Sequence, residues 1–330
     1  MSAEIFRTVI SIPPSDKKIT YKTASLLIGS CFTENMGNKL LWYKLPVFVN
    51  PFGISYNPLS IKKSLDRLIS GIEYTAKEIS YSDGLYFSFD HHSRFSDVDQ
   101  KACIAKINVS FSEAGNYLKK TSFLFLTFGT AYYYTLNSDK QIVANCHKLP
   151  EKEFSRTMLT VNEIYEAYSE LIPHLMEINP HLYIVFTVSP IRHWKDGAHE
   201  NQISKSVLLL AIDSLCKKFK NTGYFSAYEL MLDELRDYRF YEEDMLHPNK
   251  IAIDFIWKRF AGSFIENDTS RIMNEVDKIQ LSRQHRPFNI KTEVFQNFVL
   301  QQMNKIKQLN QLYPEIDLSA EYEYFANFLG

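Results

Sequence analysis

The sequence has few cysteines and no long uninterrupted apolar segment. Its four cysteines are Cys31, Cys103, Cys146 and Cys216, and no two of them have C-x-x-C spacing. This scatter argues against a structural zinc site or a disulfide framework, and it fits a reducing, cytoplasmic setting. No stretch approaches the roughly 18 uncharged apolar residues that a membrane helix needs. We therefore expect no membrane partner.

The sequence also lacks a net charge of either sign. Lys and Arg together number 37 against 38 Asp and Glu, which gives a formal net charge of −1. A net charge near zero gives no overall electrostatic attraction to nucleic acid or an anionic membrane. Binding partners therefore have to be inferred from local sites. Residues 1–10 contain Glu4 and Arg7 and no continuous apolar core, so we expect no secretory signal there.

The sequence does contain short apolar runs that alternate with helical patterns, in a chain of 330 residues that is 45% hydrophobic. Strands are expected at residues 24–28, 46–49, 123–128, 182–188 and 223–227. Hairpins are expected at residues 79–89 and 132–145. The alternation predicts a three-layer α/β/α sandwich with a parallel, flavodoxin-like sheet of about five strands and two hairpin insertions.

Beyond Asn267 the pattern changes. Polar residues dominate as far as Arg286-Pro287, and an apolar stripe with helical spacing follows at residues 290–309. We predict a main domain of residues 1–266 and a helical carboxyl-terminal appendage of residues 267–330. The stripe is expected to pack within the chain rather than to bind a partner.

A strand, a tight turn and a helix are predicted where the chain reads L-L-I-G-S-C-F-T-E-N-M-G, from Leu26 to Gly37. A serine at this junction lies at the carboxyl edge of the sheet and beside the positive end of a helix. Free backbone N–H groups there can hold a developing oxyanion. Ser30 is therefore a candidate nucleophile, and a plain helix cap is the alternative for it.

Several motifs resemble those of a known family. Gly29-Ser30-Cys31-Phe32 is similar to the G-S-C-F-A signature, with Thr33 in place of the alanine. Further similar motifs are N-P-F-G at residues 50–53, Y-N-P at 56–58, A-N-C-H at 144–147 and the segment 189–202. The chain thus resembles the GSCFA family, which belongs to the SGNH (GDSL-like) hydrolase superfamily. The resemblance implies an ester hydrolase that acts through an acyl-enzyme and needs no cofactor.

The catalytic roles follow from the same resemblance. Asp244 and His247 form a D-x-x-H in a turn before a helix, where the carboxylate can reach the imidazole Nδ1–H. This motif matches the final SGNH block, which makes Ser30 the nucleophile, His247 the general base and Asp244 its orienter. A surface turn histidine is the alternative for His247.

Cys31 is a rival nucleophile because it adjoins Ser30. Consecutive helical side chains point about 100° apart, so both cannot face one base. Ser30 is preferred, since it ends the strand, where the nucleophile of the superfamily lies.

Backbone oxyanion donors are expected near the end of the second strand. Gly53 corresponds by resemblance to the glycine block whose N–H helps to form the oxyanion hole, and a glycine allows close backbone approach. A plain turn is the alternative for Gly53. Asn57 precedes Pro58 and is at least a helix cap.

The side-chain oxyanion donor of the superfamily is missing from its usual place. The third SGNH block is a glycine followed two residues later by an asparagine, but here Gly129 is followed by Ala131, which cannot donate. Asn145 and Asn201 are candidate substitutes. Asn145 is preferred, because the second hairpin returns it to the same edge of the sheet.

The loop from Ser189 to Asn201 is dense in functional groups. Its two histidines, His193 and His199, with Arg192 and Asp196 could bind an anionic substrate or orient a leaving group, and solvated loop charge is the alternative. His193, Asp196 and His199 have side chains of metal-ligand type. No H-E-x-x-H pattern supports a metal, however, and none is expected.

We therefore predict a serine-dependent ester hydrolase of the SGNH type that acts on a small-molecule or carbohydrate ester. Tyr132, Tyr133, Tyr134 and Trp194 could border the site and stack on a sugar ring, which favours an acetylated carbohydrate. Two alternatives remain open. One is an acyltransferase with the same triad, and the other is a binding module that kept the scaffold but lost turnover.

Overall fold

The structure is a computed structural model, and it describes residues 8–285 and 289–329. The expectation for the amino terminus as far as residue 7, and the one for Arg286-Pro287, lie outside the described residues. The strands are β1 Ser25–Gly29, β2 Val47–Val49, β3 Ser80–Ser82, β4 Leu85–Phe87, β5 Phe123–Phe128, β6 Tyr132–Leu136, β7 Ile142–Val143, β8 Phe154–Met158, β9 Tyr183–Val188 and β10 Thr222–Tyr224. The α-helices are α1 Cys31–Trp42, α2 Pro58–Ser70, α3 Gln100–Lys120, α4 Val161–Ile178, α5 Gly197–Lys218, α6 Ala227–Glu229, α7 Lys250–Phe264, α8 Asn267–Gln284, α9 Glu293–Leu312 and α10 Ser319–Ala326.

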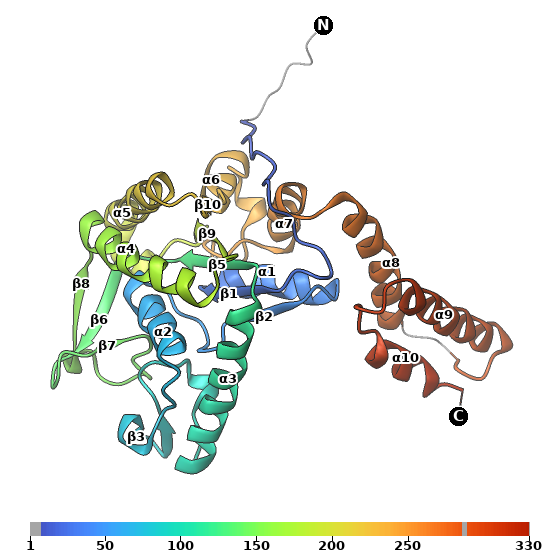
Figure 1. The fold of residues 1–330 in the computed structure, drawn as a ribbon, viewed down its shortest axis with the longest axis horizontal. Helices are drawn as coiled ribbons and strands as arrows, with labels where there is room; N and C mark the ends of the chain where they lie inside the picture. Colours follow the sequence, from blue (N-terminus) through green and yellow to red (C-terminus); the bar gives the residue numbers. More distant parts are fainter. Residues whose placement is uncertain (1–7, 286–288, 330) are drawn as a thin grey trace, which may run out of the picture.

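A parallel five-stranded sheet forms the centre of the protein, with the strand order β10-β9-β5-β1-β2 (Figure 1). Numbered along the chain, these strands have the flavodoxin-like order 2-1-3-4-5. The predicted architecture is confirmed. The direction of winding reverses between β1 and β5, and ligands of such folds bind at that point, outside the carboxyl ends of the strands.

Helices cover both faces of the sheet, as the alternation of side chains along each strand requires. Leu26 and Ile28 of β1 are buried in one apolar cluster with residues of α2, α3, α4 and α5. Leu27, between them, is buried in a second cluster with residues of α1 and α7. The two clusters make the three-layer sandwich.

Both predicted hairpins form, since β3 pairs with β4 and β6 pairs with β7, each antiparallel. The sequence analysis did not predict β8, which pairs with β6 from Tyr132–Met158 to Leu136–Phe154. The three central residues of β8 are polar and exposed. The strand therefore lacks the alternating apolar pattern that identifies a half-buried strand.

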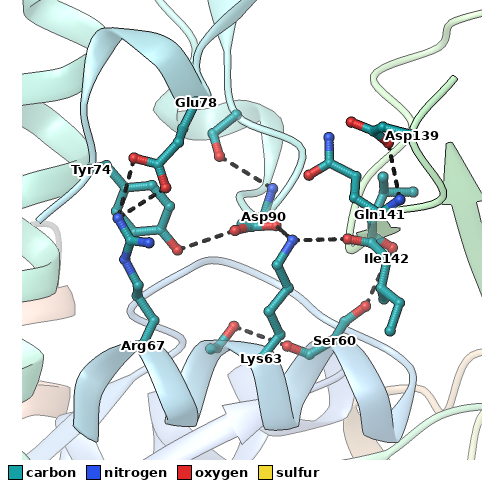
Figure 2. A network of polar contacts seen from close by, with 12 residues as sticks. Ser60, Lys63, Arg67, Tyr74, Glu78, Asp90, Asp139, Gln141 and Ile142 are labelled. Atoms are coloured by element: carbon teal, nitrogen blue, oxygen red, sulfur yellow. Dashed lines mark hydrogen bonds and ion pairs between the residues drawn. The ribbon is translucent and has the colours of Figure 1, made fainter. Parts of the chain in front are cut away.

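A polar network ties both hairpins to α2 (Figure 2). Lys63 of α2 donates to Asp90, 2.5 Å away, and to the carbonyl oxygen of Ile142 in β7, 3.0 Å away. Arg67 of the same helix pairs with Glu78 at 2.9 Å. Lys63, Arg67, Glu78 and Asp90 line a cavity of about 790 Å³. Because their charges neutralise one another, the cavity does not favour an ionic ligand.

The carboxyl-terminal helices extend to one side of the sandwich, beyond α1 and α7 (Figure 1). The sequence analysis included α8 in the helical appendage but did not predict it as a separate helix, because polar residues dominate its composition. The Trp42 indole of α1 donates to Asp277 of α8 at 2.7 Å, which anchors this helix. The division into two domains at residue 266 remains a prediction. No described helix is long and apolar enough to cross a membrane.

Candidate active site

The turn before α7 joins Asp244 and His247 as the D-x-x-H spacing predicts. Nδ1 of His247 lies 2.5 Å from Oδ2 of Asp244. Oδ1 of Asp244 accepts the backbone N–H groups of Leu246 and His247, each at 2.9 Å. Together these hydrogen bonds hold the pKa of Asp244 well below its usual range, and the one from the backbone N–H of His247 contributes most. The carboxylate therefore stays ionised and orients the imidazole.

Nε2 of His247 lies near the thiol of Cys31. It lies 3.9 Å from Sγ of Cys31. The Ser30 side chain is buried, and its hydroxyl finds no hydrogen-bond partner among the described residues. The role of Ser30 as nucleophile therefore stays a prediction.

Ser30 and Cys31 lie at the boundary between β1 and α1. β1 ends at Gly29, and Ser30 is the extended N-cap residue, with φ −71° and ψ 179°. Cys31 is the first residue of α1, at the positive end of the helix. The sequence analysis placed the base opposite Ser30, and the structure brings it within 3.9 Å of the neighbouring Cys31.

Burial and neighbouring groups shift the pKa of the Cys31 thiol in opposite directions. Burial raises the pKa of the thiol, and the N–H groups of Phe32 and Cys31 act in the opposite direction. The charge of Lys205 also lowers this pKa, while that of Glu34 raises it. The thiol is therefore protonated at rest, and a base has to accept its proton before or during any attack.

Lys205 is a buried lysine near the site that the sequence analysis missed. Its side chain is fully buried, and Nζ donates to the carbonyl oxygens of Gly129 and Ser189 at 2.7 and 2.8 Å. Burial lowers the pKa of Lys205 to about 7. A signal was present in the sequence, since Ser204 and Lys205 share the apolar face of α5 with Leu208, at helical spacing.

A cavity of about 370 Å³ opens next to the end of β5, and Tyr56, Asn145 and His193 belong to its wall. The His193 ring lies edge-on to Tyr56, with ring centroids 5.3 Å apart. Burial lowers the pKa of His193 to about 4, and the charge of Lys205 acts in the same direction. Burial and, to a smaller extent, the charge of Cys31 raise the pKa of Tyr56 to about 12, which indicates that this wall lies near the thiol.

The structure gives Gly53 and Asn57 structural roles. The Gly53 N–H donates to the carbonyl oxygen of Asn50 at 2.8 Å, so it is not free for an oxyanion. The Asn57 side chain caps α2, since Oδ1 accepts from Ser60 N at 2.8 Å and Nδ2 donates to Ser60 Oγ at 2.9 Å. Asn57 borders the 370 Å³ cavity, but its side chain is already hydrogen-bonded to Ser60.

The remaining predicted residues differ in accessibility. Gly129 lies at the end of β5, and its N–H donates to the carbonyl oxygen of Tyr56 at 2.7 Å. Asn145 lines the cavity, and its Oδ1 accepts the N–H of His147 at 2.8 Å. Asn201 is fully buried, and its Oδ1 accepts Nε–H of Arg192 at 3.1 Å. Asn145 is therefore placed to meet a ligand and Asn201 is not.

No group of three His, Cys, Asp or Glu side chains that could hold a metal ion occurs within residues 8–285 and 289–329. Asp196, which the sequence analysis considered as a metal ligand, forms an ion pair with Arg156.

Comparison with known proteins identifies two matching family models. The model described as the GSCFA family matches residues 25–260, and the model described as the GSCFA domain protein, C-terminal domain, matches residues 276–329. None of the curated proteins that were compared matches the chain. Among solved structures, the crystal structure of a carbohydrate esterase family 3 from Talaromyces cellulolyticus is similar, at 8% identity and a TM-score of 0.34. The similarity covers 78% of this chain and 99% of that one.

Proposed function

The chain belongs to the GSCFA family, and on that premise we propose that it is an ester hydrolase in which Cys31, His247 and Asp244 form the catalytic triad. The single observation that carries the proposal is the position of His247. Its Nδ1 is held by Asp244 at 2.5 Å, and its Nε2 lies 3.9 Å from the Cys31 thiol. Contacts between nucleophile and base are often longer in free enzymes and tighten with substrate.

The first half of the reaction forms a thioester. Nε2 of His247 takes the proton of the Cys31 thiol while Sγ attacks the ester carbonyl carbon. The carbonyl oxygen becomes an oxyanion, which the N–H groups at the start of α1 stabilise. When this intermediate collapses, the C–O bond breaks and His247 gives its proton to the leaving alkoxide.

The second half releases the acyl group. His247 takes a proton from a water molecule, and the resulting hydroxide attacks the thioester carbonyl. The C–S bond breaks, the acid leaves, and Cys31 regains its proton from His247. An alcohol in place of water gives acyl transfer by the same steps, so acyltransferase activity remains a second form of the proposal.

We also propose membership of the SGNH superfamily and a small or carbohydrate ester as substrate. The 2-1-3-4-5 sheet and the D-x-x-H turn before the last helix of the sandwich support the first proposal. Tyr132 and Tyr134 in the wall of the 370 Å³ cavity support the second. Asn145, in the same wall, remains the proposed side-chain donor to the oxyanion.

Alanine variants test the assignment with p-nitrophenyl acetate and acetylated sugars as substrates. Cys31→Ala and His247→Ala are expected to lose at least about a thousandfold in kcat/KM, and the double variant little more than either single variant. Ser30→Ala is the matched control, since its hydroxyl contacts no base. It is expected to keep kcat/KM within about threefold.

Two results would overturn the assignment. If Ser30→Ala collapses while Cys31→Ala remains active, the nucleophile is the serine. If the wild-type protein turns over no ester and Cys31 reacts with electrophiles no faster than a free thiol, the protein is a binding module on this scaffold.

A further inference from the structure

The buried lysine Lys205 has no part in the proposed reaction, yet its amine lies at the edge of the sheet where that reaction takes place. Its helix α5 packs on one face of the sheet, and α1 packs on the opposite face. The side chain reaches the carboxyl edge, where Nζ donates to the carbonyl oxygens of Gly129 after β5 and Ser189 after β9. Because the side chain is fully buried, solvent screens its charge weakly.

The first residue of α1 lies at the same level of this edge. β1 and β5 pair in parallel, with Gly29 opposite Thr127. Cys31 and Gly129 each follow two residues later along their chains, and neighbouring strands are about 4.8 Å apart. The amine that is hydrogen-bonded to the carbonyl oxygen of Gly129 therefore lies near the start of α1.

The charges of the lysine and the thiol act on each other. Burial raises the pKa of the Cys31 thiol, and the charge of Lys205 is among the influences that lower it. Burial lowers the pKa of Lys205 to about 7, while Cys31 raises it and the charge of Arg192 lowers it. The lysine therefore changes its charge near neutral pH.

The other groups near this pair differ in how they titrate. The Tyr228 ring of α6 lies 5.5 Å from Nζ of Lys205, and burial raises the pKa of its hydroxyl. Burial lowers the pKa of His193 to about 4. Glu34 of α1 raises the pKa of the thiol. His247 has to be controlled for, because an imidazole can change its charge near neutral pH.

We propose that Lys205 is a positioning residue for the nucleophile, and that its ammonium group stabilises the Cys31 thiolate from the buried side of the site. The inference rests on the proposed function for the role of Cys31. Below pH 7 the lysine already carries its proton. Above that pH it takes up a proton from water as the thiol loses one, so that the ion pair forms with no net release of protons.

Alkylation of the full-length protein by iodoacetamide measures the thiolate without turnover. The thiolate sulfur displaces iodide, and peptide mass spectrometry follows the rate at each cysteine. Both proteins that are compared carry His247→Gln, which removes the imidazole charge. A nearby opposite charge increases the ionised fraction of an acid about tenfold or more, and the weaker nucleophilicity of a more acidic thiol offsets part of this gain. We expect Lys205→Met to slow the alkylation of Cys31 about threefold to tenfold below pH 7.

The pH dependence distinguishes an effect of charge from an effect of structure. The difference between the two proteins should shrink above pH 7 and vanish by about pH 9, because a neutral amine no longer stabilises the thiolate. A mere loss of hydrogen bonds would change the rate by the same factor at every pH. Equal rates at every pH, or a ratio that does not change with pH, would overturn the inference.

A second cysteine and a second lysine supply the controls. Burial raises the pKa of Cys146 to about 11, and the charge of Lys195 lowers it. The rate at Cys146 should therefore not respond to Lys205→Met. Lys195 is exposed, so Lys195→Met should leave the rate at Cys31 within about twofold. An equal response of both cysteines to Lys205→Met would show a general change of structure and would contradict the proposed ion pair.

If Lys205→Met does not fold, the His247→Gln protein alone decides. Its Cys31 rate should flatten just above pH 7, where the lysine loses its charge, whereas the Cys146 rate should rise about tenfold per pH unit. A Cys31 rate that rises evenly through this range rules out the coupling.

Hydrolysis of p-nitrophenyl acetate separates this inference from the function. If hydrolysis requires Cys31 but alkylation shows no coupling to Lys205, the inference is wrong and the function stands. If the coupling is present and the wild type hydrolyses no ester, the function is wrong and the ion pair stands.

Discussion

Cys31 occupies the first position of α1, and this position suits a sulfur nucleophile. The N–H groups of Cys31 and Phe32 lie close enough to lower the pKa of the thiol, while burial raises it. A helix start stabilises negative charge on sulfur as it develops. Ser30 is the N-cap of the same helix, and its buried hydroxyl has no hydrogen-bond partner among the described residues.

The triad shows what can be predicted from local sequence. Asp244 and His247 are three residues apart in one turn, so their contact depends on local geometry, and the sequence predicts it. Whether Ser30 or Cys31 faces His247 depends on where the strand stops and the helix begins. A shift of one residue in that boundary exchanges the two side chains, and boundaries are the least certain part of a sequence prediction.

Lys205 combines full burial with two hydrogen bonds to carbonyl oxygens. A neutral amine has two N–H groups, which is the number that these carbonyls accept. The neutral form therefore satisfies the site without a buried charge, in agreement with a pKa lowered to about 7 by burial.

The pH dependence of stability tests this account of Lys205. In the unfolded chain, Lys205 keeps its proton up to its ordinary pKa of 10.5, whereas the folded protein releases it near 7. The unfolded state binds more protons between these values, so the wild type gains stability relative to Lys205→Met as pH rises from 7 to 10.5. The slope reaches at most about 1.4 kcal/mol per pH unit.

Denaturant unfolding at several pH values measures this difference. Lys101→Met, at an exposed site on α3, is the control and is expected to show no such slope. A constant difference between wild type and Lys205→Met over the whole range would show that Lys205 keeps an ordinary pKa.

At the scale of elements, the loop after β2 is fixed by Gly53. Its φ is +83°, in the left-handed region, and a Cβ there would lie 2.1 Å from Cβ of His92. The N–H of Gly53 already donates a hydrogen bond to the carbonyl oxygen of Asn50. The glycine that the resemblance assigned to the oxyanion hole is therefore required for close packing of the loop.

A pair of glycine substitutions tests this role. Gly71, the C-cap of α2, also has positive φ, +66°, but open space where a Cβ would lie. Gly71→Ala is expected to lose about 1–2 kcal/mol from backbone strain alone. Gly53→Ala adds a steric clash and is expected to lose about 2–5 kcal/mol. Equal losses in urea unfolding would contradict the packing role.

The sequence predicts the elements of the sheet well because buried parallel strands are continuous apolar runs. β5 is buried along its whole length, and its predicted bounds are those of the structure. β8 and the separate helix α8 were missed for the opposite reason. Both are mainly polar, and each is stabilised by neighbours that are distant in sequence: β8 by pairing with β6, and α8 by Trp42.

At the scale of the whole molecule, buried charge links the sandwich to the carboxyl-terminal helices. Glu321 of α10 is buried, and its Oε1 accepts from Lys44 at 2.8 Å, Gln280 at 3.0 Å and Arg283 at 3.3 Å. Lys44 follows Tyr43, the C-cap residue of α1. The carboxylate thus joins the end of α1 to the appendage.

Removal of Lys44 tests whether the two parts unfold together. Lys44→Met is expected to destabilise the protein by about 1–3 kcal/mol, because Glu321 loses a charged partner. Unfolding should remain a single transition, and kcat/KM should be unchanged, since α1 separates Lys44 from Cys31 by about 18 Å. Two separate transitions in calorimetry would show instead that the appendage is an independent unit.

The central claim is that the acyl group passes through Cys31. The most direct measurement is to quench the protein with acid during turnover of p-nitrophenyl acetate and to locate the acetyl group by fragmentation mass spectrometry. The account predicts that the acetyl group is on the Cys31 sulfur. Neutral hydroxylamine should remove it, and it should accumulate when deacylation is slow. An acetyl group on the Ser30 oxygen would contradict it.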